Sequence, residues 1–257
     1  MEKGEADKIK GVIKDALGFV FARQKKEGGF SLTPELPATL EDTYYAFKIL
    51  EVAKGLDIKI TNFYIDAHKL YLISKLKTIQ QLNKKSAYQL LFCLNFIGEK
   101  ILNPFTKIKE EVLSLEDAFY FLKCSELLEQ KLKLNIVEYG FIGIIKKRFM
   151  SLYLDRAFKA NKIQDKLAAD WISSCQNPDG GFGFLPGTTS FIENTFWAIK
   201  ALKLLKTPLE QMDITKCYIF SCKTKGGGFS RKAGAAPFLD ATFYAVVSIY
   251  NLMENTG

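Results

Sequence analysis

The chain has 257 residues, 48% of them hydrophobic, and carries a formal net charge of +8 at pH 7. This length and composition can bury a sizeable core as one domain, which we expect to span residues 1–257. No apolar run approaches the roughly 18 residues that a membrane-spanning helix needs, so we expect no transmembrane segment.

A three-part phrase recurs along the chain and predicts stacked repeats. In every copy a phenylalanine precedes a threonine, or an alanine in its place, by 13 residues. The copies are Gly28-Gly29-Phe30 with Thr43-Tyr44-Tyr45, Asn103-Pro104-Phe105 with Ala118-Phe119-Tyr120, Gly180-Gly181-Phe182 with Thr195-Phe196-Trp197, and Gly227-Gly228-Phe229 with Thr242-Phe243-Tyr244. Self-similarity at fixed spacing is typical of architectures in which no unit buries its apolar face alone.

Each clear copy joins two predicted helices. An apolar helix, such as 13–23 or 166–175, ends near the Gly-Gly pair, and a second helix begins close to the threonine. We expect Gly29, Gly181 and Gly228 to adopt backbone conformations that a β-carbon penalises.

The spacing of the copies predicts the number of helix pairs. Successive threonine positions are 75, 77 and 47 residues apart, and the two longer gaps exceed one helix pair. A degenerate pair therefore fits in each gap, with candidates at 86–98 and 134–158. The total is about six helix pairs, and strand signals are nearly absent. The predicted fold is all-α: an α/α toroid (α6–α6 barrel) whose second helices form the inner wall.

The second helices open with acidic residues. These are Glu41-Asp42, Glu116-Asp117, Glu193-Asn194 and Asp240-Ala241. Carboxylates in a first helical turn are favoured by the helix dipole and accept from unpaired backbone N–H groups. Helix capping is therefore the structural interpretation of these acids.

A helical wheel drawn from each threonine position separates two faces of the second helix. Positions four and seven beyond it are apolar, as in Phe47 and Leu50, and must pack on the outer helices. Positions two and five lie on the opposite face, which in an inner helix lines the central cavity. Position two is aromatic in all four copies and position five is lysine in three: Tyr45, Tyr120, Trp197 and Tyr244, with Lys48, Lys123 and Lys200.

Two interpretations of this face are open, because aromatic rings and lysines also occur on solvent-facing helices. Repetition of the same register favours the cavity, since solvent selects weakly for Trp and Tyr. An aromatic wall with a few cations suits an amphipathic anion, whose hydrocarbon body packs on the rings while its phosphate or carboxylate pairs with lysine. The net positive charge agrees with an anionic partner, and we expect no nucleic-acid partner.

At these residues the chain resembles the prenyltransferase and squalene-oxidase repeat superfamily, which includes protein prenyltransferase β subunits and triterpene cyclases. The resemblance rests on Gln24 and Gln176, which precede two of the Gly-Gly-Phe phrases, and on the acidic-Thr-aromatic helix starts. It implies an α/α toroid whose apolar central funnel holds isoprenoid chains. It also implies that the aromatic residue at position 197 lines that funnel.

The catalytic signatures of the superfamily are incomplete in this chain. Its zinc-dependent members carry an Asp-x-Cys motif just before the Trp-bearing helix and a His before the last threonine. At the matching positions this chain has Phe191, Glu193 and Ala241. Phe and Ala cannot ligate zinc, so we expect no metal and no other cofactor. Class II cyclases carry an Asp-x-Asp-Asp-Thr motif, whose middle carboxylic acid protonates the substrate. The incomplete match here leaves Glu41 and Asp42 as the candidates for an alkene-protonating acid.

The sequence thus predicts an isoprenoid-binding protein for a polyprenyl diphosphate or similar lipid, with zinc-independent transfer or cyclisation left open. The alternative is a non-catalytic interaction toroid that has lost the ancestral chemistry and holds a protein partner. An open aromatic funnel favours the first interpretation, and a cavity plugged by side chains favours the second.

Three other features of the sequence are assigned no catalytic or ligand-binding role. Five cysteines, an odd number, are typical of reduced thiols and predict a cytoplasmic protein. His68, the only histidine, is expected at the surface or between helices. The run Lys146-Lys147-Arg148 is typical of a solvated helix face.

Overall fold

A computed structural model of the chain describes residues 3–99, 113–129 and 143–254. The degenerate copy at Asn103-Pro104-Phe105 lies outside these residues, as does the stretch 134–142 of the predicted pair at 134–158. All structural statements below concern the described residues.

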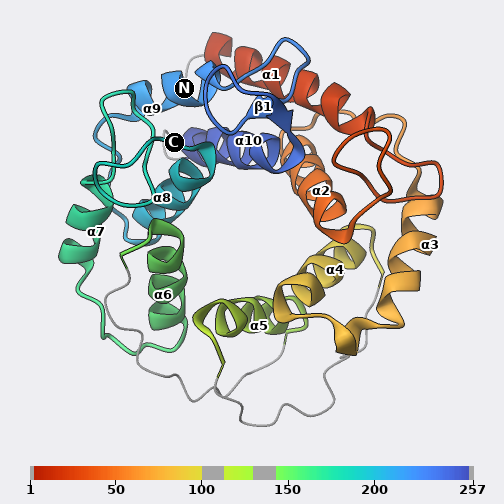
Figure 1. Cartoon of the computed structure of the whole chain (residues 1–257), viewed down its shortest axis with the longest axis horizontal. Helices are drawn as coiled ribbons and strands as arrows, with labels where there is room; N and C mark the ends of the chain where they lie inside the picture. The colour runs from red at the N-terminus through yellow and green to blue at the C-terminus, as the bar shows by residue number, and fades with distance from the viewer. Residues whose placement is uncertain (1–2, 100–112, 130–142, 255–257) are drawn as a thin grey trace.

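Six of the described helices form the inner wall of a ring (Figure 1). They are α2 (Leu40–Gly55), α4 (Lys84–Phe96), α5 (Leu115–Leu127), α6 (Ile145–Ala157), α8 (Ile192–Leu204) and α10 (Leu239–Glu254). Each inner helix packs against the next inner helix along the chain, and α10 packs against α2. The wall therefore closes on itself.

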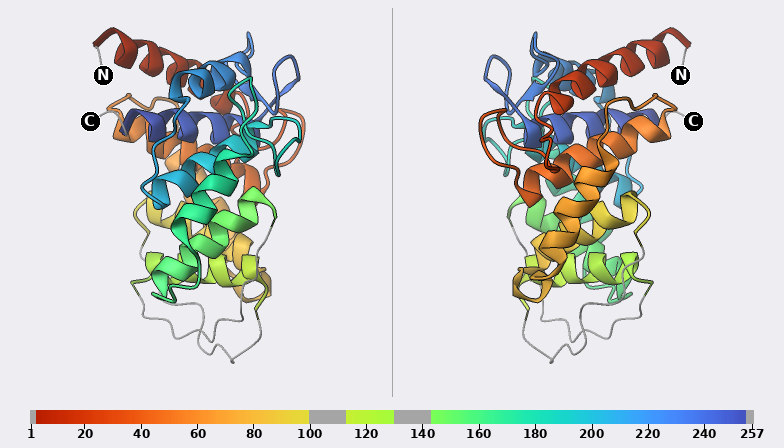
Figure 2. Two further views of the ribbon diagram at one scale, coloured as in Figure 1. Left: turned by 90° about the vertical axis from the view of Figure 1, so that its left-hand side faces the viewer. Right: turned by 90° about the vertical axis from the view of Figure 1, so that its right-hand side faces the viewer.

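Four more helices in the described part of the chain lie outside this wall (Figures 1 and 2). They are α1 (Lys3–Phe21), α3 (Ile65–Leu76), α7 (Asp165–Ser173) and α9 (Met212–Ser221). A 3₁₀ turn, η1 (Ile79–Gln81), precedes α4. Two short antiparallel strands, β1 (Phe229–Ser230) and β2 (Pro237–Phe238), precede α10.

The predicted all-α toroid is confirmed by this arrangement. Helices α4 and α6 occupy the inner positions that the two long gaps between threonines indicated, and α6 begins at Ile145. Six inner helices match the predicted number of repeats. Over the residues that the structure describes, no helix combines the length and hydropathy needed to cross a membrane.

The 13-residue spacing of the repeated phrase is a hydrogen-bonded latch. In the second clear copy the Thr195 hydroxyl accepts from the backbone N–H of Phe182 at 3.0 Å and donates to the carbonyl of Phe191 at 3.0 Å. Thr43 and Thr242 make the same pair of bonds in the other two copies. The hydroxyl thus satisfies a buried N–H and fixes the loop against the first turn of the inner helix.

Each Gly-Gly turn packs against the outer helix of a neighbouring repeat. A β-carbon on Gly180 would lie 2.4 Å from the carbonyl oxygen of Ile214 in α9, and one on Gly181 would lie 2.7 Å from the Tyr218 ring. Gly228 meets the ring of Phe19 in α1 in the same way. The first helix therefore serves as the neighbour of the last repeat, and this contact helps to close the ring.

The physical reason given above for the second glycine of each pair needs correction. Gly29 has a positive φ of 78°, as predicted, but Gly181 and Gly228 do not. At these two positions the constraint is contact with an aromatic ring, and the positive φ belongs to the preceding glycine, 85° at Gly180.

We expect Gly180→Ala to lower the free energy of unfolding by about 3 kcal/mol, and Gly187→Ala by about 1 kcal/mol. Both glycines have a positive φ, 85° and 78°, but a β-carbon at Gly187 meets nothing within 4 Å. The pair therefore separates backbone strain from the clash with Ile214. Urea unfolding of both variants measures the difference, and equal losses would show that the turn does not press on α9.

His68 holds the first Gly-Gly turn against α3. Its Nδ1 accepts from the backbone N–H of Gly29 at 2.9 Å, so Nε2 carries the proton and donates to Gln24 Oε1 at 3.1 Å. The ring is fully buried and stacks on Phe30 and Phe63. Burial lowers the pKa of His68 to about 4, so the ring is neutral near pH 7. Its role is structural.

Candidate functional site

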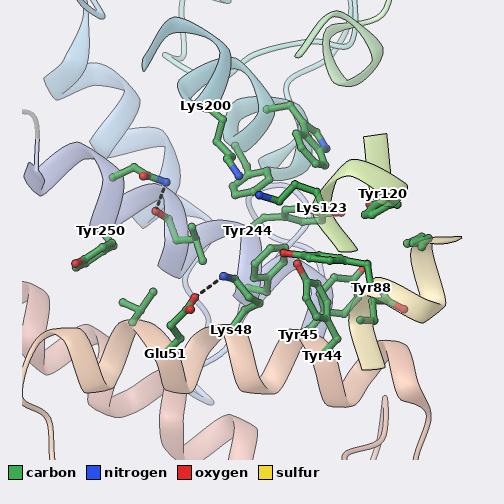
Figure 3. Close-up of a pocket in the computed structure, with 18 of the residues that line it drawn as sticks. Tyr44, Tyr45, Lys48, Glu51, Tyr88, Tyr120, Lys123, Lys200, Tyr244 and Tyr250 are labelled. Atoms are coloured by element: carbon green, nitrogen blue, oxygen red, sulfur yellow. Dashed lines mark hydrogen bonds and ion pairs between the residues drawn. The ribbon is translucent and has the colours of Figure 1, made fainter. Parts of the chain in front are cut away.

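The inner wall encloses a cavity of about 470 Å³ (Figure 3). All six inner helices contribute side chains to it. The lining includes Tyr44, Tyr45, Lys48, Glu51, Lys85, Tyr88, Phe119, Tyr120, Lys123, Lys146, Phe196, Trp197, Lys200, Phe243, Tyr244, Val247, Tyr250 and Asn251.

All seven residues that the helical wheel singled out as ligand-binding line this one cavity. The four aromatic residues are Tyr45, Tyr120, Trp197 and Tyr244, and the three lysines are Lys48, Lys123 and Lys200. Val247, which replaces lysine in the last copy, lines it too. The face therefore points into the ring rather than to the outer surface. A ligand-binding role for these residues stays a prediction.

The aromatic residues form a closed circuit around the cavity. Neighbouring ring centroids are 4.8–6.1 Å apart along Tyr44, Tyr88, Tyr120, Phe119, Phe149, Trp197, Phe196 and Phe243 and back to Tyr44. Rings at these separations stabilise one another beyond their buried area. Because the contacts join equivalent positions of successive inner helices, those helices run in the same direction.

Of the eight rings in this circuit, the helical wheel singled out two, Tyr120 and Trp197. The residue directly after the threonine position is aromatic in every inner helix, including Tyr88 of α4 and Phe149 of α6. In those two helices the equivalent position follows from the first-turn bonds from Ala87 to Asn83 and from Arg148 to Ile144. The aromatic doublets of the four recognised copies were the sequence signal for this second register.

Carboxylates in the first turns of α2 and α8 accept hydrogen bonds from three aromatic side chains that line the cavity. Glu193 Oε1 accepts from Trp197 Nε1 at 3.3 Å and from the Tyr244 hydroxyl at 3.2 Å. Glu41 Oε1 accepts from the Tyr45 hydroxyl at 3.0 Å and from Lys85 at 2.6 Å. These bonds fix the rings with their apolar faces toward the cavity.

Two of the three predicted lysines are paired with carboxylates. Lys48 pairs with Glu51 of its own helix and also lies over the Phe92 ring. Lys123 pairs with Glu126 and donates to the Tyr153 hydroxyl at 3.0 Å. Burial alone would lower the pKa of Lys123, but the hydrogen bonds raise it above its ordinary value.

Lys200 differs from the other two. It lies over the rings of Phe149 and Phe196, at 5.1 and 5.3 Å from their centroids, and no carboxylate of the described residues forms an ion pair with it. Desolvation, followed by the positive charges of Lys48 and Lys123, lowers the pKa of Lys200 to about 7.

The two candidate catalytic acids lie outside the residues that line this cavity. Asp42 accepts from the Thr39 hydroxyl at 2.6 Å, and the Thr39 oxygen accepts from the Asp42 N–H at 3.0 Å, which is a helix cap. Burial raises the pKa of Asp42. Burial would also raise the pKa of Glu41, but the ammonium of Lys85 lowers it below its ordinary value. Both acids thus have structural partners, and their catalytic role remains a prediction.

The positions compared with zinc ligands carry side chains of other kinds. Ala241 is fully buried, Phe191 precedes the first turn of α8, and Glu193 holds Trp197 and Tyr244. In the described ranges no three His, Cys, Asp or Glu side chains lie close enough together to hold a metal ion.

The interpretation of Lys146-Lys147-Arg148 as a solvated face is wrong for two of its residues. Arg148 is 6% exposed and its guanidinium lies over the Trp171 ring. Lys146 lines the cavity beside Trp197. The three consecutive charges in the sequence do not reveal that Arg148 is buried or that Lys146 lines the cavity.

The fold and the cavity together define a class: an α/α toroid with a central, aromatic-walled cavity that carries lysines. The chain belongs to the family described as the prenyltransferase alpha-alpha toroid domain, which it matches over residues 4–89 and 118–256. The predicted relation to prenyltransferase-like toroids is thereby confirmed.

Among solved structures, the chain is similar to Candida albicans protein geranylgeranyltransferase-I complexed with GGPP. The sequences are 15% identical, the match covers 84% of this chain and 85% of that chain, and the TM-score is 0.38. No curated protein matches the sequence.

Proposed function

We propose that this chain binds an amphipathic anionic lipid, of the isoprenoid diphosphate class, in its central cavity. The observation that carries the proposal is the lining itself, which combines seven of the eight rings of the aromatic circuit with five lysines. An isoprenoid chain gains from burial against the rings, and a diphosphate gains charge-assisted hydrogen bonds from ammonium groups.

The charge of the cavity supports an anion over a neutral or cationic ligand. Five lysines line it: Lys48, Lys85, Lys123, Lys146 and Lys200. Among the described lining residues Glu51 is the only carboxylate, and it is paired with Lys48. Lys85, Lys123 and Lys146 are also paired, with Glu41, Glu126 and Glu116, but these carboxylates do not line the cavity. The cavity surface itself therefore carries more amino groups than carboxylates, which favours an anionic headgroup. The volume of about 470 Å³ lies in the range typical of small-molecule sites.

We propose binding rather than a catalytic step. Cyclisation started by protonating an alkene would need a free carboxylic acid beside the bound chain, and Glu51, the carboxylate among the described lining residues, is engaged by Lys48. Transfer would need a nucleophilic acceptor placed beside the carbon that carries the diphosphate. The alternative of a non-catalytic interaction toroid expects side chains to fill the ring. The open cavity therefore favours the binding proposal.

A fluorescence titration tests the proposal. The chain has two tryptophans, so the Trp171→Phe variant leaves Trp197 as the emitting residue in the cavity wall. We expect both geranylgeranyl diphosphate and geranylgeraniol to change its emission. Because the lysines act on the charged headgroup, the affinity for the diphosphate should fall with added salt while that for the alcohol should not.

The Trp197→Phe variant, which keeps Trp171, is the matched control and should give no ligand-dependent signal. A Trp197 signal that responds to neither ligand would contradict the proposal. The same salt dependence for both ligands would contradict the role given to the lysines.

A further inference from the structure

Lys200 is set apart from the other lysines of the cavity by its surroundings. It projects from α8 into the cavity (Figure 3). Its ammonium group lies over the rings of Phe149 and Phe196, and the residue is only partly exposed. Carboxylates form ion pairs with Lys48 and Lys123, whereas no described carboxylate forms one with Lys200.

The charges around Lys200 are mostly positive. Lys48 of α2, Lys123 of α5 and Lys203 of its own helix all act on it, and Glu51 of α2 opposes them. From α6 it meets the uncharged Phe149 ring, and from α10 the cavity receives Val247, Tyr250 and Asn251, which carry no charge. Desolvation and neighbouring cations are the two conditions that leave a lysine amine unprotonated near neutral pH. They agree with the pKa of about 7.

We propose that Lys200 is a reactive amine that captures an apolar aldehyde as an imine inside the aromatic cavity. The inference rests on the proposed function to the extent that the cavity must admit an apolar ligand. It goes beyond that function because the bond formed is covalent and the ligand carries a carbonyl in place of an anion. The aromatic walls select an aldehyde with a hydrocarbon body, such as an isoprenoid enal.

The reaction needs no oxidant, reductant or further reactant. The lone pair of the Lys200 Nζ attacks the carbonyl carbon, a C–N bond forms, and the carbonyl oxygen becomes a hydroxyl group. One of the two nitrogen protons supplies that hydroxyl group; the nitrogen then gives up its second proton as the hydroxyl leaves as water, and a C=N bond remains. An amine that is already neutral begins this sequence without first losing a proton.

Reductive trapping tests the proposal on the full chain. The protein is incubated with geranial at pH 7.5, reduced with borohydride and digested, and the modified peptides are identified by mass spectrometry. We expect one reduced adduct per chain, located at Lys200. Lys200→Met and Lys200→Arg should each lower adduct formation at least roughly tenfold, because neither side chain offers a neutral primary amine.

The controls separate a cavity reaction from general lysine chemistry. Lys166→Met, at an exposed position of α7, should leave the adduct unchanged. Thermal melts check that both Lys200 variants fold. If Lys200→Met does not fold, Lys200→Arg, which keeps a positive charge, still tests the proposal. No adduct on the wild-type chain, or adducts spread over exposed lysines with none at Lys200, would overturn the proposal.

The trapping result and the titration fail independently. An adduct at Lys200 without a fluorescence response to the diphosphate would leave the amine reactive and remove the proposed anionic ligand. A fluorescence response to the diphosphate without an adduct at Lys200 would support the anionic ligand and overturn the reactive amine.

Discussion

Replacing Lys48, Lys123 and Lys200 together by methionine is expected to weaken the binding of geranylgeranyl diphosphate at least about 100-fold, while binding of geranylgeraniol changes little. The ammonium groups of Lys48 and Lys123 can each give the headgroup a charge-assisted hydrogen bond, worth about 1.5–3 kcal/mol, and the Lys200 amine adds a further N–H donor. Methionine keeps an unbranched side chain of similar length and therefore maintains the packing against the rings.

The control for this experiment changes the net charge by the same amount elsewhere. Lys14, Lys59 and Lys166 are exposed and do not line the cavity, so their joint replacement by methionine should leave diphosphate binding nearly unchanged. Isothermal titration of both variants with both ligands, at one fixed salt concentration, gives the comparison. If the cavity variant kept wild-type affinity for the diphosphate, the headgroup would not bind at Lys48, Lys123 and Lys200.

The sequence predicted the aromatic and lysine faces because one hydrogen bond fixes their register. Thr195 binds the loop at Phe182, so the helical position of Trp197 relative to that threonine is the same as that of Tyr45 relative to Thr43. Once the register is fixed, the 100° step of a helix places the remaining side chains. Local geometry was sufficient here.

The same reasoning could not find Tyr88 and Phe149 as members of the wall. In α4 and α6 the threonine is replaced by Ala87 and Arg148, so the sequence marker of the register is lost while the helix itself is retained. Only the first-turn hydrogen bonds recover the equivalence. The ring contacts between successive inner helices depend on the closed tertiary structure, which no local pattern reports.

The difference in charge environment between Lys200 and the other two lysines, Lys48 and Lys123, also could not be predicted from the sequence. Lys48 and Lys123 each have a glutamate three residues later, whereas Lys200 has Lys203 at that spacing. This difference was visible along the chain, but its consequence was not. Desolvation by burial is the main cause of the low pKa of Lys200, and the charges of Lys48 and Lys123, which belong to other helices, lower it further.

Phe182→Ala is expected to lower the free energy of unfolding by about 3–5 kcal/mol. The Phe182 side chain is fully buried, and its backbone N–H forms the latch to Thr195. Truncation removes buried apolar area and leaves a cavity that rigid neighbours on both sides of the latch cannot fill. Phe184→Ala is the matched control, because Phe184 is 42% exposed two residues later and should cost less than about 1 kcal/mol. Chemical denaturation of both variants measures the two losses. A similar small loss for both would mean that the repeated phenylalanine does not anchor the loop to the ring.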